Sequence, residues 1–379
     1  MLDATLLLSV YAASIFLFGL ATRRLPLLAA EALHWVSALD GLRGVLATAV
    51  VVHHFAVTWQ WHISGAWQTT HSRVLNNLGA VAVSLFFMIT GYLFTRKVCA
   101  GEVAWGRLFA SRVRRIYPMY LVTVVLIVAL AFYQAPSAPL LSSLQAVGSW
   151  LLFVARPIDG YADTARINAG VQWTLLYEAV FYLSLPLLHC VLRRRLALWP
   201  VVVTVAILLC LWPLYHEAFH NRFLKLFVVG VVVALAERHL AARVGNPNHW
   251  GFTLLAIGVL AAALKMHSYS TGQMLILGVP FALFVLGNNL AGLLESRVLK
   301  VLGEASFSVY LLHGIVLYVL FTVWGAYSFD GASLGVFALC WLPWVLWLTS
   351  SLSVLAYWAI ERPFIVGGHR AKRMVEGAA

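Results

Sequence analysis

The stretch Asp40-Gly-Leu-Arg43-Gly-Val-Leu-Ala-Thr-Ala-Val-Val-Val-His-His54 decides the fold of this chain. Its segment from Gly44 to Val52 is almost wholly apolar, so we expect it to lie in a membrane-spanning helix. The eleven steps of about 100° from Arg43 to His54 bring His54 to within roughly 20° of the Arg43 face, about 16 Å further along the axis. We therefore expect Arg43 near one membrane surface and His54 close to mid-depth on the same side of the helix.

Ionisable side chains at membrane depth are costly, and by default they indicate function. His54 is the first candidate for a functional group. The adjacent His53 points roughly 80° away on the helix and is the weaker candidate. The alternative is that His54 is a buried histidine that is hydrogen-bonded for packing.

The composition predicts an all-α, polytopic membrane helix bundle. The chain has 379 residues, of which 62% are hydrophobic and only 11% are charged, a balance that no soluble domain tolerates. Counting apolar runs long enough to cross a bilayer gives about eleven transmembrane helices. Their expected ranges are 4–21, 42–60, 78–95, 116–135, 172–192, 197–214, 223–237, 250–265, 271–290, 306–325 and 334–359.

The distribution of positive charge predicts the orientation. A net charge of +12 would suggest nucleic acid in a soluble protein, but no nucleic-acid partner is expected for a membrane bundle. With the N-terminus outside, all but six of the 26 Lys and Arg residues fall on the inner side. The six outer residues are Arg73, Arg156, Arg166, Arg222, Lys225 and Lys265. Because positive charge collects in cytoplasmic loops, the sequence predicts an N-out, C-in protein of the cell (inner or plasma) membrane.

The cysteines give no sign of a metal or redox centre. The four residues are scattered without a ligand or redox spacing, at Cys99, Cys190, Cys210 and Cys340. We expect no metal and no permanently bound cofactor. The helix at 4–21 lacks a basic leading region, so we interpret it as a retained helix.

Two loops differ from the short connections elsewhere. The outer segment from about Pro136 to Val171 contains a run at 144–154 that is too short to span and could lie along the membrane. This segment is either a cap that binds an acceptor or a plain connector. The inner loop from Arg96 to Tyr117 is the most basic part of the chain.

At the end of this inner loop, Arg112 and Arg115 are three residues apart and share a helical face. Together they can bind one polyanion, because guanidinium groups form paired hydrogen bonds with phosphate oxygens. The alternative is that they only set the topology and contact anionic head groups of membrane lipid.

Six segments, taken together, resemble the acyltransferase-3 family. The first is Leu39-Asp40-Gly-Leu-Arg43-Gly44 with ten residues between Arg43 and His54. The second is the aromatic-rich Phe86–Tyr92, in which Thr90 replaces the family's usual Ser and Tyr92 its Phe. The others are Arg112-Val-Arg-Arg115-Ile-Tyr-Pro, Trp173-Thr-Leu-Leu-Tyr-Glu178, Ser306-Phe-Ser-Val-Tyr310-Leu-Leu-His313 and Glu361-Arg362-Pro363. Each segment is weak alone, but all six occur in the family's order.

The resemblance covers roughly residues 38–364. It implies a membrane acyltransferase core at 36–365, preceded by an extra transmembrane helix and linker at 1–35 and followed by a basic cytoplasmic tail at 366–379. It further implies an integral-membrane O-acyltransferase that uses acyl-CoA, most often acetyl-CoA. The acceptor would be a hydroxyl of an extracytoplasmic or lipid-linked glycan, such as a surface polysaccharide.

The resemblance also suggests roles for single residues. Arg112, Arg115 and Arg43 would bind the CoA phosphates, while Arg43 could instead orient Asp40. His54 would act as general base, since a neutral imidazole can take a proton from an attacking hydroxyl. Glu178 is the candidate carboxylate and could approach His54 near mid-membrane; together with Asp40, these two form the expected catalytic group.

Several of these residues have a second interpretation. Glu178 could be solvated near the outer interface or paired with Arg166. Tyr310 and His313 could line the donor channel or form hydrogen bonds between helices. Trp173 lies at interfacial depth, where aromatic residues are ordinary, so packing is the stronger interpretation.

A proton-coupled transporter or a flippase could use the same buried polar residues. A transporter would predict paired midplane sites and inverted repeats, and the sequence contains neither pattern. The acceptor, the acyl group's length and the oligomeric state are left open by the sequence.

Overall fold

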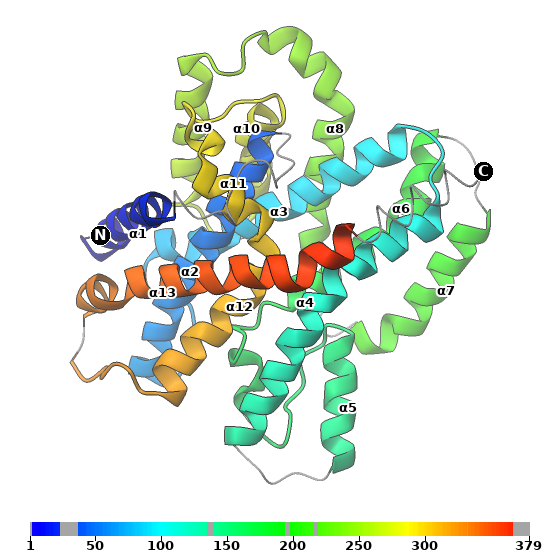
Figure 1. Ribbon diagram of the computed structural model, residues 1–379. Coiled ribbons are helices and arrows are strands. Elements are labelled where there is room, and N and C mark those ends of the chain that lie inside the picture. The colour runs from blue at the N-terminus through cyan, green and yellow to red at the C-terminus, as the bar shows by residue number, and fades with distance from the viewer. Residues whose placement is uncertain are drawn as a thin grey trace. The chain divides into compact units, whose positions relative to one another are not determined.

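The computed structural model describes residues 2–22, 37–134, 140–193, 198–215, 219–331 and 333–366. Within these ranges the chain forms thirteen α-helices and no strand (Figure 1). The predicted linker after the first helix and the predicted basic tail lie outside the described residues, apart from single residues at their ends.

Each of the eleven apolar ranges predicted from the sequence coincides with an α-helix. These are α1 (Leu2–Ala21), α2 (Ala38–Ser64), α3 (Arg73–Cys99), α4 (Trp105–Gln134), α6 (Trp173–Arg193), α7 (Leu198–Tyr215), α8 (Leu224–Val244), α9 (Trp250–Ala263), α10 (Thr271–Val285), α12 (Ser306–Tyr318) and α13 (Leu334–Ala356). The remaining two are α5 (Leu140–Leu151) and α11 (Arg297–Glu304). Short π-helical segments extend α12 and α13, namely η6 (Val319–Val323) and η7 (Tyr357–Glu361), and three 3-10 turns are η3 (Ala162–Arg166), η4 (Asn221–Phe223) and η5 (Leu293–Glu295).

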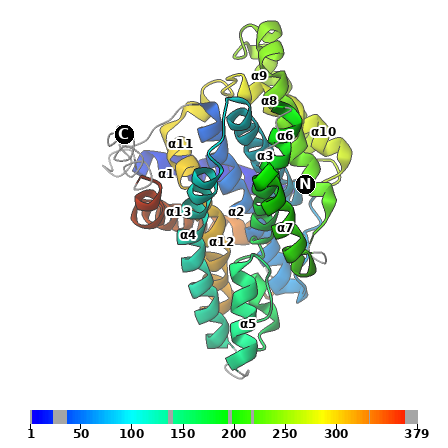
Figure 2. The same cartoon turned by 90° about the vertical axis from the view of Figure 1, so that its right-hand side faces the viewer.

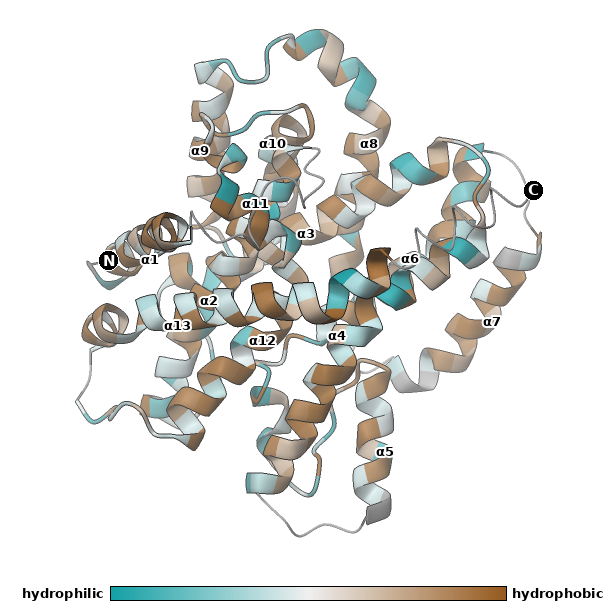
Figure 3. Cartoon of the chain, in the orientation of Figure 1, coloured by the Kyte–Doolittle hydropathy of each residue, from teal (hydrophilic) through white to brown (hydrophobic). Residues whose placement is uncertain are grey.

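The described helices are those of a polytopic membrane bundle. Seven of them are long and apolar enough to cross a bilayer, and three more are apolar but shorter. Large apolar side chains are exposed along α7, as expected of a helix that faces lipid; they include Val202, Leu209 and Trp212. Apolar residues predominate along most helices in Figure 3, while hydrophilic residues gather in the first turns of α4 and in the connection from α8 to α9. The fold class is confirmed, whereas the count of eleven spans and the N-out, C-in orientation stay predictions.

One boundary differs from the prediction. The basic segment 96–117, expected to be an inner loop, is mostly helical, because α3 continues to Cys99 and α4 begins at Trp105. The prediction followed hydropathy alone, but arginine is a strong helix former and extends an apolar helix beyond its apolar part. Arg112 and Arg115 therefore stand on a regular helix.

The protein divides into two compact units. The first comprises residues 1–91 and 225–354, and the second comprises 92–224 and 355–379. In the first unit α2 packs against α11 and α12, and α9 packs against α10. Along α2, Arg43 contacts Ser306 and His54 contacts His313, both in α12, and His62 contacts Thr322 in the η6 segment that extends α12. Because the residue numbers of the partners rise together along both helices, α2 and α12 run side by side in the same direction.

In the second unit α4 and α5 lie side by side, as Figures 1 and 2 show. The Tyr120 hydroxyl donates a hydrogen bond to the carbonyl of Trp150 over 2.6 Å, and the Tyr117 hydroxyl donates one to the carbonyl of Leu151 over 3.2 Å. These bonds hold the C-terminal end of α5 against α4. The run at 144–154 that was too short to span is therefore largely helix, and its C-terminal end is anchored to its neighbour.

Candidate active site

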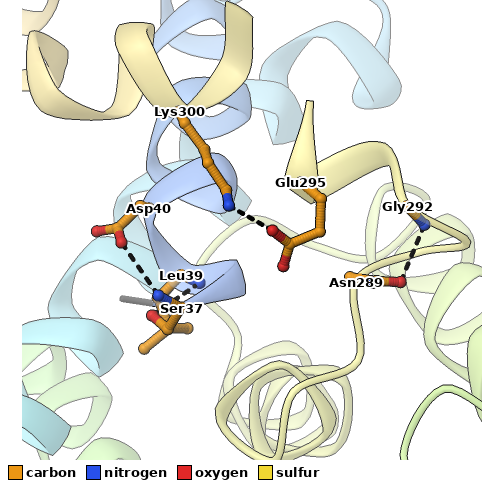
Figure 4. Close-up of polar contacts among 7 residues, drawn as sticks. All are labelled: Ser37, Leu39, Asp40, Asn289, Gly292, Glu295 and Lys300. Atoms are coloured by element: carbon orange, nitrogen blue, oxygen red, sulfur yellow. Dashed lines mark hydrogen bonds and ion pairs between the residues drawn. The ribbon is translucent and has the colours of Figure 1, made fainter. Parts of the chain in front are cut away.

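The first turn of α2 is fixed by Asp40. Its carboxylate accepts a hydrogen bond of 3.2 Å from the backbone N–H of Ser37, while the Ser37 hydroxyl accepts one of 3.3 Å from Leu39 (Figure 4). This reciprocal pair is a capping box, which satisfies N–H groups that the first helical turn leaves without partners. The structure thus gives Asp40 a role in starting the helix; its predicted catalytic role stays a prediction.

The glycines of the Asp40–Gly44 segment let α11 and η5 touch the backbone of α2. A Cβ atom on Gly41 would overlap the carbonyl oxygen of Leu294, and one on Gly44 would overlap that of Leu299. From the other side, a Cβ atom on Gly303 would overlap the carbonyl oxygen of Asp40. On the same side of the first unit, Lys300 of α11 forms an ion pair with Glu295 (Figure 4). The motif glycines therefore position α2 through close backbone packing.

Arg43 lies one helical turn beyond Asp40 and reaches across to α12. Its guanidinium donates a hydrogen bond of 2.9 Å to the hydroxyl of Ser306, the first residue of α12. Arg43 is half-buried and Ser306 is buried. This bond joins the start of α2 to the start of α12, so the Arg43 side chain points toward α12.

His54 and His313 form a hydrogen-bonded pair, called the histidine pair below. Nδ1 of His54 and Nε2 of His313 are 2.9 Å apart. Nδ1 of His313 lies 3.1 Å from the carbonyl oxygen of Val309, one turn earlier in α12. Because a carbonyl oxygen can only accept, Nδ1 of His313 must carry a hydrogen.

The carbonyl of Val309 thereby fixes the hydrogens of both rings. With its hydrogen on Nδ1, neutral His313 has a lone pair on Nε2 and accepts a hydrogen bond from His54. Neutral His54 then carries its hydrogen on Nδ1, so its Nε2 holds the lone pair. In this tautomer Nε2 of His54 can accept a proton. Of the two alternatives named for His313, the contact with His54 is a hydrogen bond between helices.

His53 is anchored elsewhere. Its Nδ1 lies 3.0 Å from the carbonyl oxygen of Leu75 in α3, so this nitrogen is a donor. Its ring packs edge-on against His54, with centroids 4.7 Å apart. Gly79 provides the room, because a Cβ atom there would collide with the His53 ring. His53 therefore packs beside the histidine pair, bonded to the backbone of another helix.

In the second unit, Arg112 and Glu178 meet through Tyr182. The guanidinium of Arg112 lies 5.0 Å from the ring centre of Phe94 and 6.0 Å from that of Tyr182. The Tyr182 hydroxyl donates a hydrogen bond of 2.9 Å to the carboxylate of Glu178. Since Glu178 and Tyr182 are four residues apart, they share one face of α6.

Arg115 and Trp173 also belong to the second unit. Arg115 is half-buried like Arg112, whereas Val113 and Arg114 between them are exposed, as expected for two residues on one helical face. Trp173 packs with its ring centre 4.9 Å from Phe223 and 5.6 Å from Tyr177. This aromatic cluster supports packing as the role of Trp173.

Glu178 and Tyr310 each had a second interpretation, pairing with Arg166 for Glu178 and contacts between helices for Tyr310. Arg166 forms an ion pair of 2.8 Å with Asp163. Tyr310 is buried on α12, with its ring centre 6.1 Å from that of His313. His54 belongs to the first unit and Glu178 to the second, so their approach stays a prediction.

Sequence reasoning missed three residues of the site. Tyr182 could have been found, because it lies one helical turn after Glu178 in a segment already singled out. Ser306 opens a quoted motif but was given no partner. Trp67, whose indole ring stacks on His54 with centroids 6.4 Å apart, gave no signal in the sequence.

The histidine pair therefore places an imidazole nitrogen with a lone pair inside a multi-pass helix bundle. The chain belongs to the acyltransferase-3 family, whose model, described as an acyltransferase domain, matches residues 36–360. The predicted resemblance is confirmed. With the fold, it makes this protein a multi-pass membrane O-acyltransferase.

Three relatives illustrate the family. Acyltransferase MdmB of Streptomyces mycarofaciens is 29% identical over 326 residues, covering 74% of this chain and 78% of that protein. Nodulation protein 10 of Rhizobium leguminosarum bv. viciae is 26% identical, covering 86% of this chain and 92% of that protein. O-acetyltransferase OatA of Staphylococcus aureus is 21% identical, covering 74% of this chain but only 50% of that protein. No solved structure matches the sequence.

Proposed function

We propose that this protein transfers an acyl group, most simply acetyl, from cytoplasmic acyl-CoA to a hydroxyl of an extracytoplasmic or lipid-linked glycan. The observation that carries the proposal is the hydrogen bond of 2.9 Å between His54 and His313, because it leaves Nε2 of His54 as proton acceptor. The cell (inner or plasma) membrane is the proposed location. The family and its O-acetyltransferase relative support the transferase class.

In the proposed reaction, Nε2 of His54 takes the proton of the acceptor hydroxyl as its oxygen attacks the thioester carbonyl carbon. The carbon–oxygen bond forms, the carbon–sulfur bond breaks, and the electron pair leaves on the CoA sulfur. The imidazolium then returns the proton to this thiolate, giving free CoA and an ester. Nδ1 of His54 stays bonded to His313 throughout, so the ring keeps its orientation.

The arginines are proposed to bind the donor. Arg112 and Arg115 share a half-buried helical face, which suits the paired oxygens of CoA phosphates. Arg43 is proposed to contact the donor from the first unit. Tyr182 contacts both residues, which supports Glu178 as a residue that orients Arg112 through this ring. Direct action of Glu178 on His54 is the second proposal for that carboxylate.

Acyl-CoA-dependent release of CoA by the purified protein in lipid nanodiscs tests the function. We expect His54→Ala to abolish release, whereas His239→Ala, at an exposed position of α8, should retain it. Arg112→Ala or Arg115→Ala should raise the KM for acyl-CoA, and Arg114→Ala, on the exposed side of the same helix, should not. Full activity of His54→Ala would disprove the proposed base. Absence of CoA release from the wild-type protein would favour the transporter or flippase alternative.

A further inference from the structure

Three aromatic rings lie beyond His54, toward the end of α2 away from Arg43. Trp67, in the turn after α2, lies almost parallel to the His54 imidazole, with an interplanar angle of 16°. Trp61 stands perpendicular to Trp67, with centroids 5.4 Å apart, and Tyr318 of α12 lies nearly parallel to Trp61 at 6.4 Å. We call Trp61, Trp67 and Tyr318 the aromatic wall.

Trp67 places an aromatic ring next to the proposed base. The indole and the imidazole are nearly parallel, with ring centroids 6.4 Å apart. The lone pair of an imidazole nitrogen lies in the plane of its ring. An acceptor that rests against the aromatic wall would therefore lie next to His54 and present a hydroxyl to Nε2 in this plane.

The aromatic wall is partly exposed and has polar groups beside it. Trp61 and Trp67 are half-buried, while Tyr318 behind them is only 2% exposed. The residues on either side of Trp67 are exposed. Beside the wall, Nε2 of His62 lies 3.3 Å from the hydroxyl of Thr322, which adds polar atoms next to the apolar faces.

The aromatic wall also lies away from the proposed donor contact on the same helix. Along the axis of α2, Arg43 and its partner Ser306 lie about 16 Å before His54. Trp61 lies about 10 Å beyond His54 on the same axis. A donor that arrives at the Arg43 end and an acceptor that arrives at the wall would meet at His54 from opposite sides.

We propose that the aromatic wall binds the acceptor and that the acceptor is a sugar in its ring form. A pyranose has C–H faces that pack against aromatic rings and hydroxyls at its edge that reach polar groups. In this pose one hydroxyl points at Nε2 of His54. The inference rests on the proposed function and adds to it the binding site and the ring form of the acceptor.

The test measures acetyl-CoA-dependent CoA release by the full-length protein with methyl pyranosides (gluco, galacto and manno) and with the acyclic polyol sorbitol. In the wild-type protein we expect at least one pyranoside to stimulate release and to become acetylated, as mass spectrometry would detect. Sorbitol has similar hydroxyls but no rigid C–H face, so it should need about tenfold higher concentration. Tenfold corresponds to about 1.4 kcal/mol of binding free energy.

Substitutions connect this effect to the wall. Trp67→Ala should raise the pyranoside concentration for half-maximal stimulation about tenfold. A change of this size is in the range that a lost aromatic contact produces. The KM for acetyl-CoA should stay unchanged. Trp67→Phe, which keeps an aromatic face, should recover most of the effect. Trp324→Ala is the matched control, because that side chain is 70% exposed in the same unit. An unchanged thermal unfolding temperature in the same detergent would show that Trp67→Ala is folded.

The outcomes separate this inference from the proposed function. Equal half-saturation by pyranoside and sorbitol, or an unchanged value in Trp67→Ala, would overturn the aromatic wall. So would basal CoA release that no pyranoside stimulates, although the donor chemistry would then stand. Complete absence of CoA release from the wild-type protein would overturn the proposed function and the wall with it.

Discussion

Nε2 of His313 lies 2.9 Å from Nδ1 of His54 and joins two parallel helices that are far apart in the sequence. His313 is itself fully buried and is bound to the carbonyl of Val309. The backbone of α12 therefore determines which nitrogen of His54 can accept a proton. Removing His313 should disturb the chemistry while leaving donor binding intact.

His313→Ala is expected to lower kcat by about 10²-fold, because His54 loses the partner that fixes its tautomer and orientation. The KM for acyl-CoA should not change. His313→Gln should recover part of the rate, since its amide oxygen can accept the hydrogen bond from His54. Steady-state kinetics of the two variants check this prediction; equal rates for Ala and Gln would contradict it.

Gly79→Ala is expected to reduce activity through His53. The added Cβ atom collides with the His53 ring, so the ring must leave the Leu75 carbonyl or press on His54. We expect kcat to fall by roughly tenfold, which is about 1.4 kcal/mol of activation free energy. Gly258→Ala is the control, because nothing lies within 4 Å of a Cβ atom there. Wild-type kinetics in Gly79→Ala would show that His53 does not influence His54.

Tyr182→Phe is expected to weaken acyl-CoA binding. The variant keeps the aromatic ring beside Arg112 but removes the hydroxyl that fixes this ring to Glu178. A lost hydrogen bond of about 1 kcal/mol would raise the KM for acyl-CoA roughly fivefold with little change in kcat. Tyr133→Phe, at a residue that is 70% exposed on α4, should be neutral. A fall in kcat at constant KM would instead place Glu178 in the chemical step.

Gly41→Ala is expected to destabilise the protein. Its Cβ atom would overlap the carbonyl oxygen of Leu294, and backbone cannot move aside as a flexible side chain can. We expect a loss of at least about 2 kcal/mol, the usual cost of overpacking. Gly258→Ala should be neutral or stabilising by up to about 1 kcal/mol, because alanine is the better helix former. Thermal unfolding of both variants in one detergent compares them, and equal Tm values would refute the close packing of α2 on α11 and η5.

The sequence predicted the helices well because each apolar run is locally recognisable. The predicted start of a helix was wrong where charged residues extend it. The helix predicted from residue 116 begins at Trp105, because hydropathy does not report helix propensity. Helical spacing also placed Arg43 and His54 correctly on one helix, because this geometry depends only on residues within it. It could not assign Asp40 to a capping box, which depends on the conformation of Ser37.

The sequence by itself determined the class of fold, the family and the residue types of the site, because hydropathy, spacing and motif order are properties of the amino-acid order alone. Only the tertiary structure decided which nitrogen of His54 carries the lone pair and why a Cβ atom does not fit at Gly41. It also paired Glu178 with Tyr182 and brought Trp67 to His54. The physical reason is that these contacts join segments that are far apart in the sequence. The distances between such segments are set by tertiary packing, and the local sequence does not determine them.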